Sequence, residues 1–230
     1  MRKLLICFPF AGSGTAFFRP WQGILADSFE VEPVLLPGRE RRIIERPCQT
    51  VDEAMDDTLS RLGEKVKGAS SVTVFGHSLG AVLAYAFVLR LSDETGVQAS
   101  RLIVSGSHAP HKPRTRNATG LDDDAFLARV SEFAGFDDPA MLDPEMRELI
   151  LPTLRADVAM HESYSPEPHR TASPITAIRG RDDRLVSAED LLGWQEVAEG
   201  PIEVVELPGG HMYPAEQPEP LLALLRSDAR

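Results

Sequence analysis

Residues 76–80, Gly-His-Ser-Leu-Gly, lie between an apolar run typical of a buried strand (72–75) and a stretch typical of a helix (81–89). G-x-S-x-G at a strand-to-helix junction is the pattern of a nucleophile elbow, where a strained turn presents a serine hydroxyl clear of the backbone. Glycine is needed two residues before and two residues after the serine, because a Cβ there would crowd the turn. The pattern predicts that Ser78 is a catalytic nucleophile in an α/β-hydrolase fold.

An acid and a histidine follow Ser78 in the chain order Ser, Asp, His that this fold requires. Residues 175–178 are predicted to form a short buried strand, and a loop with adjacent carboxylates at Asp182 and Asp183 follows it. Residues 202–207 are predicted to form another strand, which runs into a glycine-rich loop carrying His211. The other five histidines all precede residue 180, so His211 is the predicted general base.

Either carboxylate of the Asp182-Asp183 pair could reach the imidazole from such a loop. We favour Asp183, the fourth residue of Gly180-x-x-Asp183, because the turn after the strand would aim it towards the histidine. Asp182 is expected to cap the turn or to face solvent. Asp190 belongs to a predicted helix start with Ser187 as N-cap, where a carboxylate complements the helix dipole.

The oxyanion hole of this fold takes one backbone N–H from the residue after the nucleophile, here Leu79, and a second from the loop after the first strand. That loop is residues 9–14, and Phe10 is the preferred donor, with Ala11 as the second choice. Its glycines lack the spacing of a dinucleotide or P-loop phosphate cradle. No cofactor is therefore expected.

Three further histidines have less specific explanations. His77 lies within the elbow and is expected to point away from the serine as a packed or hydrogen-bonded loop residue. His108 and His111 have the spacing H-x-x-H, but no third ligand stands at a useful distance and Pro110 and Pro113 indicate an irregular loop. No metal site is expected.

Strand-like and helix-like segments alternate along the chain, which is typical of a mostly parallel, doubly wound α/β sheet. The predicted strands are 4–8, 31–35, 72–75, 102–105, 175–178 and 202–207, and predicted helices include 21–25 and 51–66. The stretch from about 108 to 170 interrupts this alternation with two helices, 122–133 and 144–164. We interpret it as a lid inserted into a single domain of residues 1–230. Residues 110–120 could act as its hinge, and a rigid helical cap is the alternative.

Composition excludes several classes of protein. The net charge of −11 disfavours nucleic acid as a partner, because that binding depends on Lys and Arg neutralising phosphates. Two cysteines are too few for a disulfide scaffold, so a reducing, cytoplasmic location is expected.

The apolar run at residues 4–8 breaks at Pro9 and is better explained as a buried strand than as a signal peptide. No stretch has transmembrane length, and a monomer is expected.

The chain resembles the type II thioesterases, which are stand-alone editing hydrolases of polyketide and nonribosomal peptide assembly lines. The resemblance runs nearly end to end and rests on Phe8-Pro9-Phe10-Ala11-Gly12 with Trp21, Leu36-Pro37-Gly38-Arg39-Glu40-Arg41-Arg42, Gly76 to Ala81, Leu151 to Asp157, Glu162-Ser163-Tyr164, Gly180 to Asp183, and Gly209-Gly210-His211. Departures at Ala84-Tyr85-Ala86, Ser107-His108 and Met212-Tyr213 leave the acyl-chain preference open.

The resemblance implies a triad of Ser78, Asp183 and His211. It also implies thioester substrates carried on the phosphopantetheine arm of an acyl or peptidyl carrier protein. Substrate contacts are expected at Ala11, Trp21 and Met212, where the lid would pack. Two alternatives are a general serine carboxylesterase and a non-catalytic binding protein, although the latter would have no use for a strained serine.

A basic cluster, Arg39, Arg41, Arg42 and Arg46, follows the second predicted strand. Carrier domains are typically acidic, so we hypothesise that this cluster, or a basic edge of the lid, meets the carrier or its phosphate. A solvated loop is an equally good explanation of the cluster.

Overall fold

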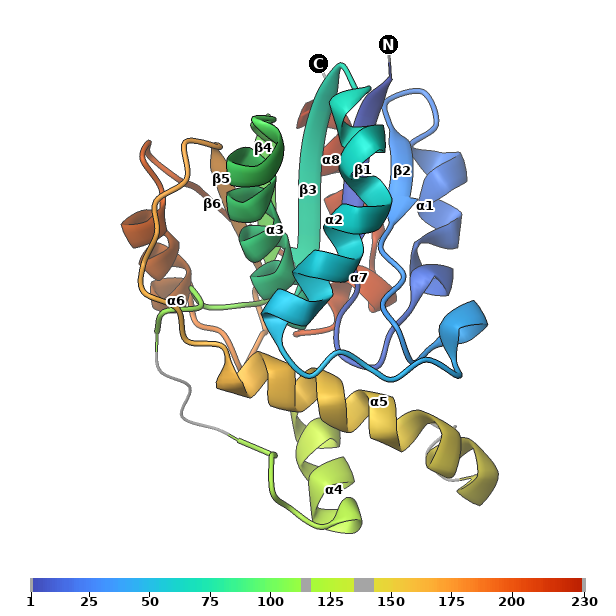
Figure 1. Cartoon of the computed structure of the whole chain (residues 1–230). Coiled ribbons are helices and arrows are strands. Elements are labelled where there is room, and N and C mark those ends of the chain that lie inside the picture. Colours follow the sequence, from blue (N-terminus) through green and yellow to red (C-terminus); the bar gives the residue numbers. More distant parts are fainter. Residues whose placement is uncertain (1, 113–116, 135–142, 229–230) are drawn as a thin grey trace.

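The structure is a computed structural model that describes residues 2–112, 117–134 and 143–228. Its centre is a six-stranded sheet in the order β2-β1-β3-β4-β5-β6, with every neighbouring pair parallel (Figure 1). The strands are β1 (Lys3–Phe8), β2 (Glu30–Pro33), β3 (Ser71–His77), β4 (Arg101–Ser105), β5 (Ile175–Gly180) and β6 (Glu203–Leu207). The predicted strands and the doubly wound α/β class are thus confirmed.

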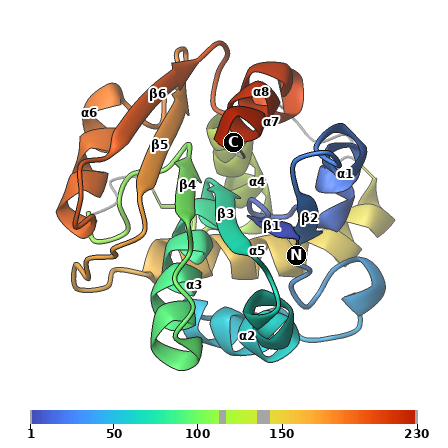
Figure 2. The same ribbon diagram turned by 90° about the horizontal axis from the view of Figure 1, so that it is seen from above.

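Helices cover both faces of the sheet, as Figure 2 shows from one end of the strands. One face packs against α2 (Val51–Lys67) and α3 (Leu79–Thr95), and the other against α1 (Arg19–Ile24) and α8 (Glu219–Asp228). Because neither face meets water, the central strands are apolar on both sides, and all residues of β1 after Lys3 are buried.

The order of the strands determines where a site can form. The chain runs from β1 outward to β2 and then returns to the other side of β1 to form β3. In such sheets ligands bind outside the carboxyl ends of the strands, at the point where the winding reverses. The carboxyl ends of β1 and β3 carry the loop of Phe10 and the elbow of Ser78, respectively.

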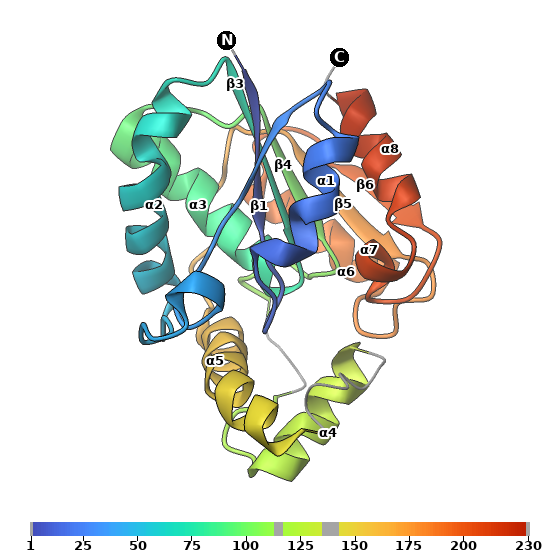
Figure 3. The ribbon, with the colours of Figure 1, turned by 90° about the vertical axis from the view of Figure 1, so that its right-hand side faces the viewer.

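Two helices lie together beyond this end of the sheet (Figures 1 and 3). They are α4 (Asp123–Ala134) and α5 (Pro144–Ser163), close to the predicted 122–133 and 144–164. A small apolar cluster, centred on Phe126, Leu151 and Leu154, joins them. Ala11 packs against both this cluster and the main core, so the two helices rest on the loop after β1. The predicted hinge, 110–120, lies partly outside the described residues.

Several short elements were not predicted: η1 (Thr15–Phe18), η2 (Glu40–Arg42), η4 (Gly193–Val197) and α7 (Tyr213–Glu216). Each is at most five residues long, too short for a hydrophobic period to emerge. By contrast, α6 (Ala188–Leu192) begins as expected, because Ser187 and Asp190 form a reciprocal capping box. No helix of the described residues is long and apolar enough to span a membrane.

Candidate active site

Ser78 stands at the junction of β3 and α3 in a strained backbone conformation, with φ 54° and ψ −118°. A Cβ on Gly76 would lie 1.8 Å from the carbonyl oxygen of Gly80, and a Cβ on Gly80 would lie 2.3 Å from that of Phe8. Only glycine therefore fits on either side of the serine. Non-glycine residues in such conformations cluster at functional sites, so the backbone supports the prediction of a nucleophile elbow.

Asp183 and His211 meet across the ends of β5 and β6. His211 Nδ1 lies 2.9 Å from Asp183 Oδ2, and the carboxylate side chain is fully buried. The other carboxylate oxygen, Oδ1, accepts the N–H groups of Leu185 at 2.8 Å and Val186 at 3.1 Å. Asp182 is exposed, and its backbone N–H donates to Gly209 O. The structure therefore places Asp183, and not Asp182, against the histidine.

These hydrogen bonds keep Asp183 ionised. Burial raises the pKa of its carboxyl, but the hydrogen bond and charge of His211, together with the two backbone N–H groups, outweigh burial and hold the pKa below its ordinary value. A carboxylate in this position holds the proton of the histidine on Nδ1. The other ring nitrogen, Nε2, is then free to accept a proton from a serine hydroxyl.

The loop that carries His211 packs directly on the end of β5. A Cβ on Gly180 would lie 2.1 Å from the carbonyl oxygen of Gly210, and Gly209 has a φ of +105°. Glycine at these positions lets the loop approach the strand closely enough for His211 to reach Asp183.

A buried polar network of Tyr213, Ser105 and His77 lies next to His211. Tyr213 OH lies 2.5 Å from Ser105 Oγ, which lies 2.8 Å from His77 Nδ1. The rings of His77 and His211 are 5.0 Å apart between centroids, and Gly106 is so close that a Cβ would meet both. Burial and the neighbouring His211 lower the pKa of His77 well below its ordinary value, so His77 is neutral. No local pattern predicts this network, since Ser105 and Tyr213 are 108 residues apart along the chain.

The expected oxyanion donors lie at the ends of adjacent strands. Leu79 is the first residue of α3, so its N–H has no partner within the helix. Phe10 follows β1, and its ring packs edge-on against Phe17 and His77. Within the described residues, the N–H groups of Phe10 and Leu79 donate to no backbone acceptor.

The three predicted substrate contacts have different surroundings. Ala11 is partly buried beneath α4 and α5, and Met212 is buried next to His211. Trp21 is only 2% exposed and packs in an aromatic cluster with Phe18 and Phe75, on the face of the sheet that α1 and α8 cover. Trp21 is thus a core residue, and its ring contacts Phe17, which in turn contacts Phe10. Substrate contact at these three residues stays a prediction.

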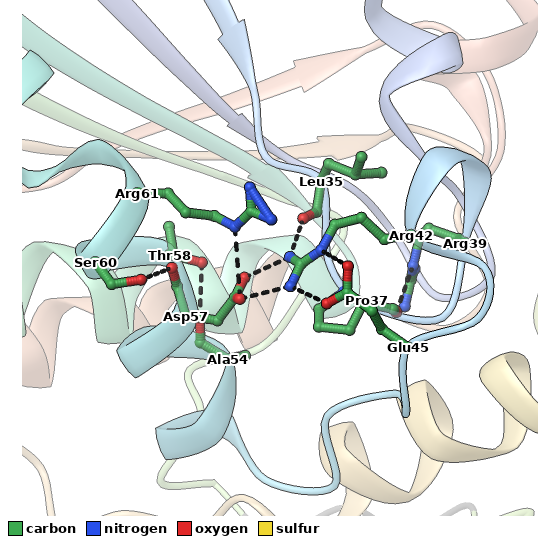
Figure 4. A network of polar contacts seen from close by, with 10 residues as sticks. All are labelled: Leu35, Pro37, Arg39, Arg42, Glu45, Ala54, Asp57, Thr58, Ser60 and Arg61. Carbon is green, nitrogen blue, oxygen red and sulfur yellow. Dashed lines mark hydrogen bonds and ion pairs between the residues drawn. The ribbon is translucent and has the colours of Figure 1, made fainter.

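The basic cluster is not one surface, and this part of the docking hypothesis is wrong. Arg42 is buried, and its guanidinium makes ion pairs with Asp57 and Glu45 (Figure 4). Arg39 is also buried, and it pairs with Asp157. Only Arg41 and Arg46 of the cluster are exposed. Sequence analysis missed these pairs because Asp57 and Asp157 lie on separate helices, 15 and 118 residues further along the chain from their arginines.

No three His, Cys, Asp or Glu side chains in the described parts of the chain come together as metal ligands would. His111, one member of the H-x-x-H pair, instead lies 3.0 Å from Glu196. Cys7 and Cys48 are both buried, unbridged thiols, and burial raises the pKa of each.

The parallel sheet, the elbow after β3 and the acid and histidine loops after β5 and β6 together define a protein of the α/β-hydrolase class. Within that class the family is shown by sequence. The model of the thioesterase domain matches residues 3–228, so the chain belongs to the thioesterase family and is a thioester hydrolase. The resemblance to this family is thereby confirmed.

Relatives and solved structures are similar over nearly the whole chain. Thioesterase PikA5 of Streptomyces venezuelae is 32% identical, and the match covers 93% of this chain and 76% of the relative. The gramicidin S biosynthesis protein GrsT of Aneurinibacillus migulanus is 30% identical, and the match covers 91% of this chain and 82% of the relative. The RedJ thioesterase of the prodiginine pathway in Streptomyces coelicolor superimposes with a TM-score of 0.88 at 33% identity, covering 98% and 85%.

Proposed function

We propose that this protein hydrolyses acyl thioesters carried on the phosphopantetheine arm of carrier proteins, and that it removes stalled or aberrant acyl groups in polyketide or nonribosomal peptide biosynthesis. The observation that carries the proposal is the hydrogen bond between Asp183 and His211 at the same end of the sheet as the strained Ser78. The naming of relatives such as YbtT, a type II thioesterase of a mixed peptide and polyketide pathway, supports the substrate class.

The mechanism follows from the three side chains. His211, held by Asp183, takes the proton of Ser78 as the hydroxyl oxygen attacks the thioester carbonyl carbon. The N–H groups of Phe10 and Leu79 stabilise the negative oxygen of the tetrahedral intermediate. The carbon–sulfur bond then breaks, and because a thiol has a pKa of about 8.5 its thiolate leaves readily, taking the proton that His211 carries and returning His211 to its neutral form. Water, activated by His211, next cleaves the acyl-enzyme ester and releases the free acid. No cofactor takes part in these steps.

The substrate class is tested by presenting one acyl group in three forms: bound to a carrier, as a short free thioester and as an oxygen ester. We expect the highest kcat/KM for the carrier thioester, and no turnover by Ser78→Ala. Equal or faster turnover of the oxygen ester would indicate a general carboxylesterase. If the wild-type protein turns over none of the three, it is a binding protein.

Arg41 and Arg46 are the members of the basic cluster that stay available to an acidic carrier. Between them Ile44 is 95% exposed, so the same loop offers an apolar contact. The double variant Arg41→Glu, Arg46→Glu should raise KM for the carrier thioester and leave KM for the short thioester unchanged. Lys67→Glu with Arg226→Glu changes the total charge equally at the opposite end of the sheet and is the matched control. If both double variants behave alike, this loop is not the docking surface.

A further inference from the structure

Two of the segments on which the resemblance to this family rests take no part in the proposed triad. They are residues 37–40, Pro-Gly-Arg-Glu, and residues 154–157, Leu-Arg-Ala-Asp. In the structure they meet. Arg39 Nη2 donates to Asp157 Oδ1 at 2.7 Å, and Arg39 Nη1 donates to Asp157 Oδ2 at 2.8 Å. The side chains are 8% and 1% exposed, so this is a two-point ion pair removed from water.

The same pair holds the loop after β1. The N–H of Gly12 donates to Asp157 Oδ2 at 2.8 Å, and Arg39 Nη1 donates to the carbonyl of Ser13 at 2.8 Å. These two residues complete a tight turn that begins at Phe10, since the N–H of Ser13 donates to Phe10 O at 3.0 Å. Gly12 has a positive φ, +75°, as the third residue of a type II turn does, a conformation that favours glycine. One ion pair thus fixes both a donor and an acceptor of this turn.

Neighbouring residues extend the same attachment. Glu40 accepts the N–H of Ala16 at 2.8 Å, and the hydroxyl of Thr153 donates to Gly38 O at 2.7 Å. Glu40 has a φ of 49°, which a non-glycine residue keeps only where its surroundings hold it firmly. The loop after β1, the loop after β2 and helix α5 are therefore joined through polar contacts, of which those of Arg39 with Asp157 and of Thr153 with Gly38 are buried.

We infer that Arg39 and Asp157 are positioning residues for the oxyanion hole. By holding Gly12 and Ser13, they fix the orientation of the turn whose first residue, Phe10, supplies the second N–H to the oxyanion. The inference rests on the proposed function, because it assigns a role to residues around the same Ser78. It also gives α5 a role: the middle part of this helix, which carries Thr153 and Asp157, supports the catalytic framework.

Fold stability alone does not explain this arrangement. A buried ion pair is often no more stabilising than apolar side chains of similar volume, because both charges lose their hydration. Apolar residues could fill the space between α5 and the loop after β1. They could not accept the N–H of Gly12 and donate to the carbonyl of Ser13, which the pair does.

The chain contains a matched control for the experiment. Arg42 makes a two-point ion pair with Asp57, with both distances 2.7 Å, and also donates to Leu35 O (Figure 4). This pair begins on the same loop and its arginine is equally buried, but the Arg42 guanidinium donates to Leu35, Glu45 and Asp57, none of them in the turn after β1. Asp57→Asn therefore weakens a similar pair without touching the turn of Phe10.

The experiment compares Asp157→Asn with Asp57→Asn on a short acyl thioester. It also measures inhibition by an acyl trifluoromethyl ketone. Ser78 Oγ would add to the carbonyl carbon of this ketone, and the hydroxyl proton of Ser78 would pass to His211. The carbonyl oxygen would then become an oxyanion. Asp157→Asn should lower kcat by about 100-fold with little change in KM, because a displaced donor is lost mainly in the transition state. Binding of the ketone should weaken by a similar factor. Asp57→Asn should lower Tm while kcat and ketone affinity stay near wild type.

A second variant separates positioning from stability. Arg39→Met with Asp157→Leu replaces the pair by apolar side chains, and should recover Tm while kcat stays low. If Asp157→Asn does not fold, Arg39→Lys is the substitute, because it keeps the charge but loses the two-point geometry. If the folded variants of Arg39 and Asp157 keep wild-type kcat and ketone affinity, the inference about these two residues is wrong, whereas the proposed function stands. A wild-type protein that turns over no ester and binds no ketone would overturn the proposed function as well.

Discussion

The imidazole rings of His77 and His211 lie 5.0 Å apart, centroid to centroid, and are tilted by 45° to each other. His77 is fully buried, and burial is the main cause that lowers its pKa. The positive form of His211 lowers this pKa further, whereas the negative Asp183 raises it. Its Nδ1 lies 2.8 Å from Ser105 Oγ. A neutral histidine is thus packed against the proposed base, so no second positive charge stands beside the imidazolium that forms during catalysis.

The stability of the protein should fall in acid because of His77. Its pKa is lower in the folded state than the ordinary value of about 6.5, so the unfolded chain binds the proton more readily. The stabilising contribution is complete above about pH 6.5 and is lost as pH falls towards the folded-state pKa, at up to about 1.4 kcal/mol per pH unit. Urea unfolding between pH 7 and pH 5 measures this slope.

His77→Gln removes this titration, so its stability should depend less on pH than that of the wild type over the same range. Asp183, whose folded-state pKa is also lowered, should contribute a further loss, but only below about pH 4, where carboxylates titrate. Identical slopes for the wild type and His77→Gln between pH 7 and pH 5 would contradict the assignment of a neutral, buried His77.

Removing the carboxylate of the proposed triad should leave the fold but abolish most activity. Asp183→Asn cannot hold the histidine in the tautomer that accepts the proton of Ser78, so kcat should fall by about 10⁴-fold. Asp182→Asn is the matched control, because the two residues are adjacent and Asp182 is exposed. Steady-state kinetics on a short thioester measures both, and equal losses would show that the acid was wrongly assigned.

The hydroxyl of Tyr213 should matter more for activity than for folding. Tyr213→Phe removes the hydrogen bond to Ser105 behind His211 and should cost about 1 kcal/mol of stability. Looser support of the His211 loop should lower kcat by about tenfold, equivalent to about 1.4 kcal/mol. Tyr85→Phe removes a comparable hydrogen bond, to His169 O, from a buried tyrosine of α3. It should lose similar stability with unchanged kcat; a loss of kcat in both variants would argue against a specific role for Tyr213.

Gly106 should tolerate no side chain. It has a φ of +57°, and a Cβ there would lie 2.5 Å from His77 Cε1 and 3.2 Å from His211 Cε1. Gly106→Ala should destabilise the protein by about 1–3 kcal/mol and lower kcat by about 100-fold through displacement of His211. Gly63→Ala lies within α2 with no atom within 4 Å of its Cβ, and should stabilise by about 0.5–1 kcal/mol. Thermal unfolding and kinetics of both variants measure these effects.

The sequence by itself predicted the fold class and the elbow, because both depend on local patterns. Alternating apolar runs and helical periods specify a parallel sheet, and two glycines around Ser78 specify the turn. The chain order of Asp183 and His211 predicted the acid and the base, whose side chains the structure brings to 2.9 Å. Tertiary packing shifted the element boundaries by a few residues. The predicted strand at 31–35, for example, lies at Glu30–Pro33.

Only the tertiary structure decided which polar side chains pair with each other. In the sequence Arg39 and Arg42 belong to one basic loop. In the structure Arg39 pairs with Asp157 of α5, whereas Arg42 pairs with Asp57 of α2. Tyr213, Ser105 and His77 likewise come from three separate segments. Such contacts join residues far apart along the chain, and a buried charge or hydroxyl must find its partner wherever the packed elements bring one. No local pattern specifies that partner, because the arrangement of the whole sheet and its helices determines it.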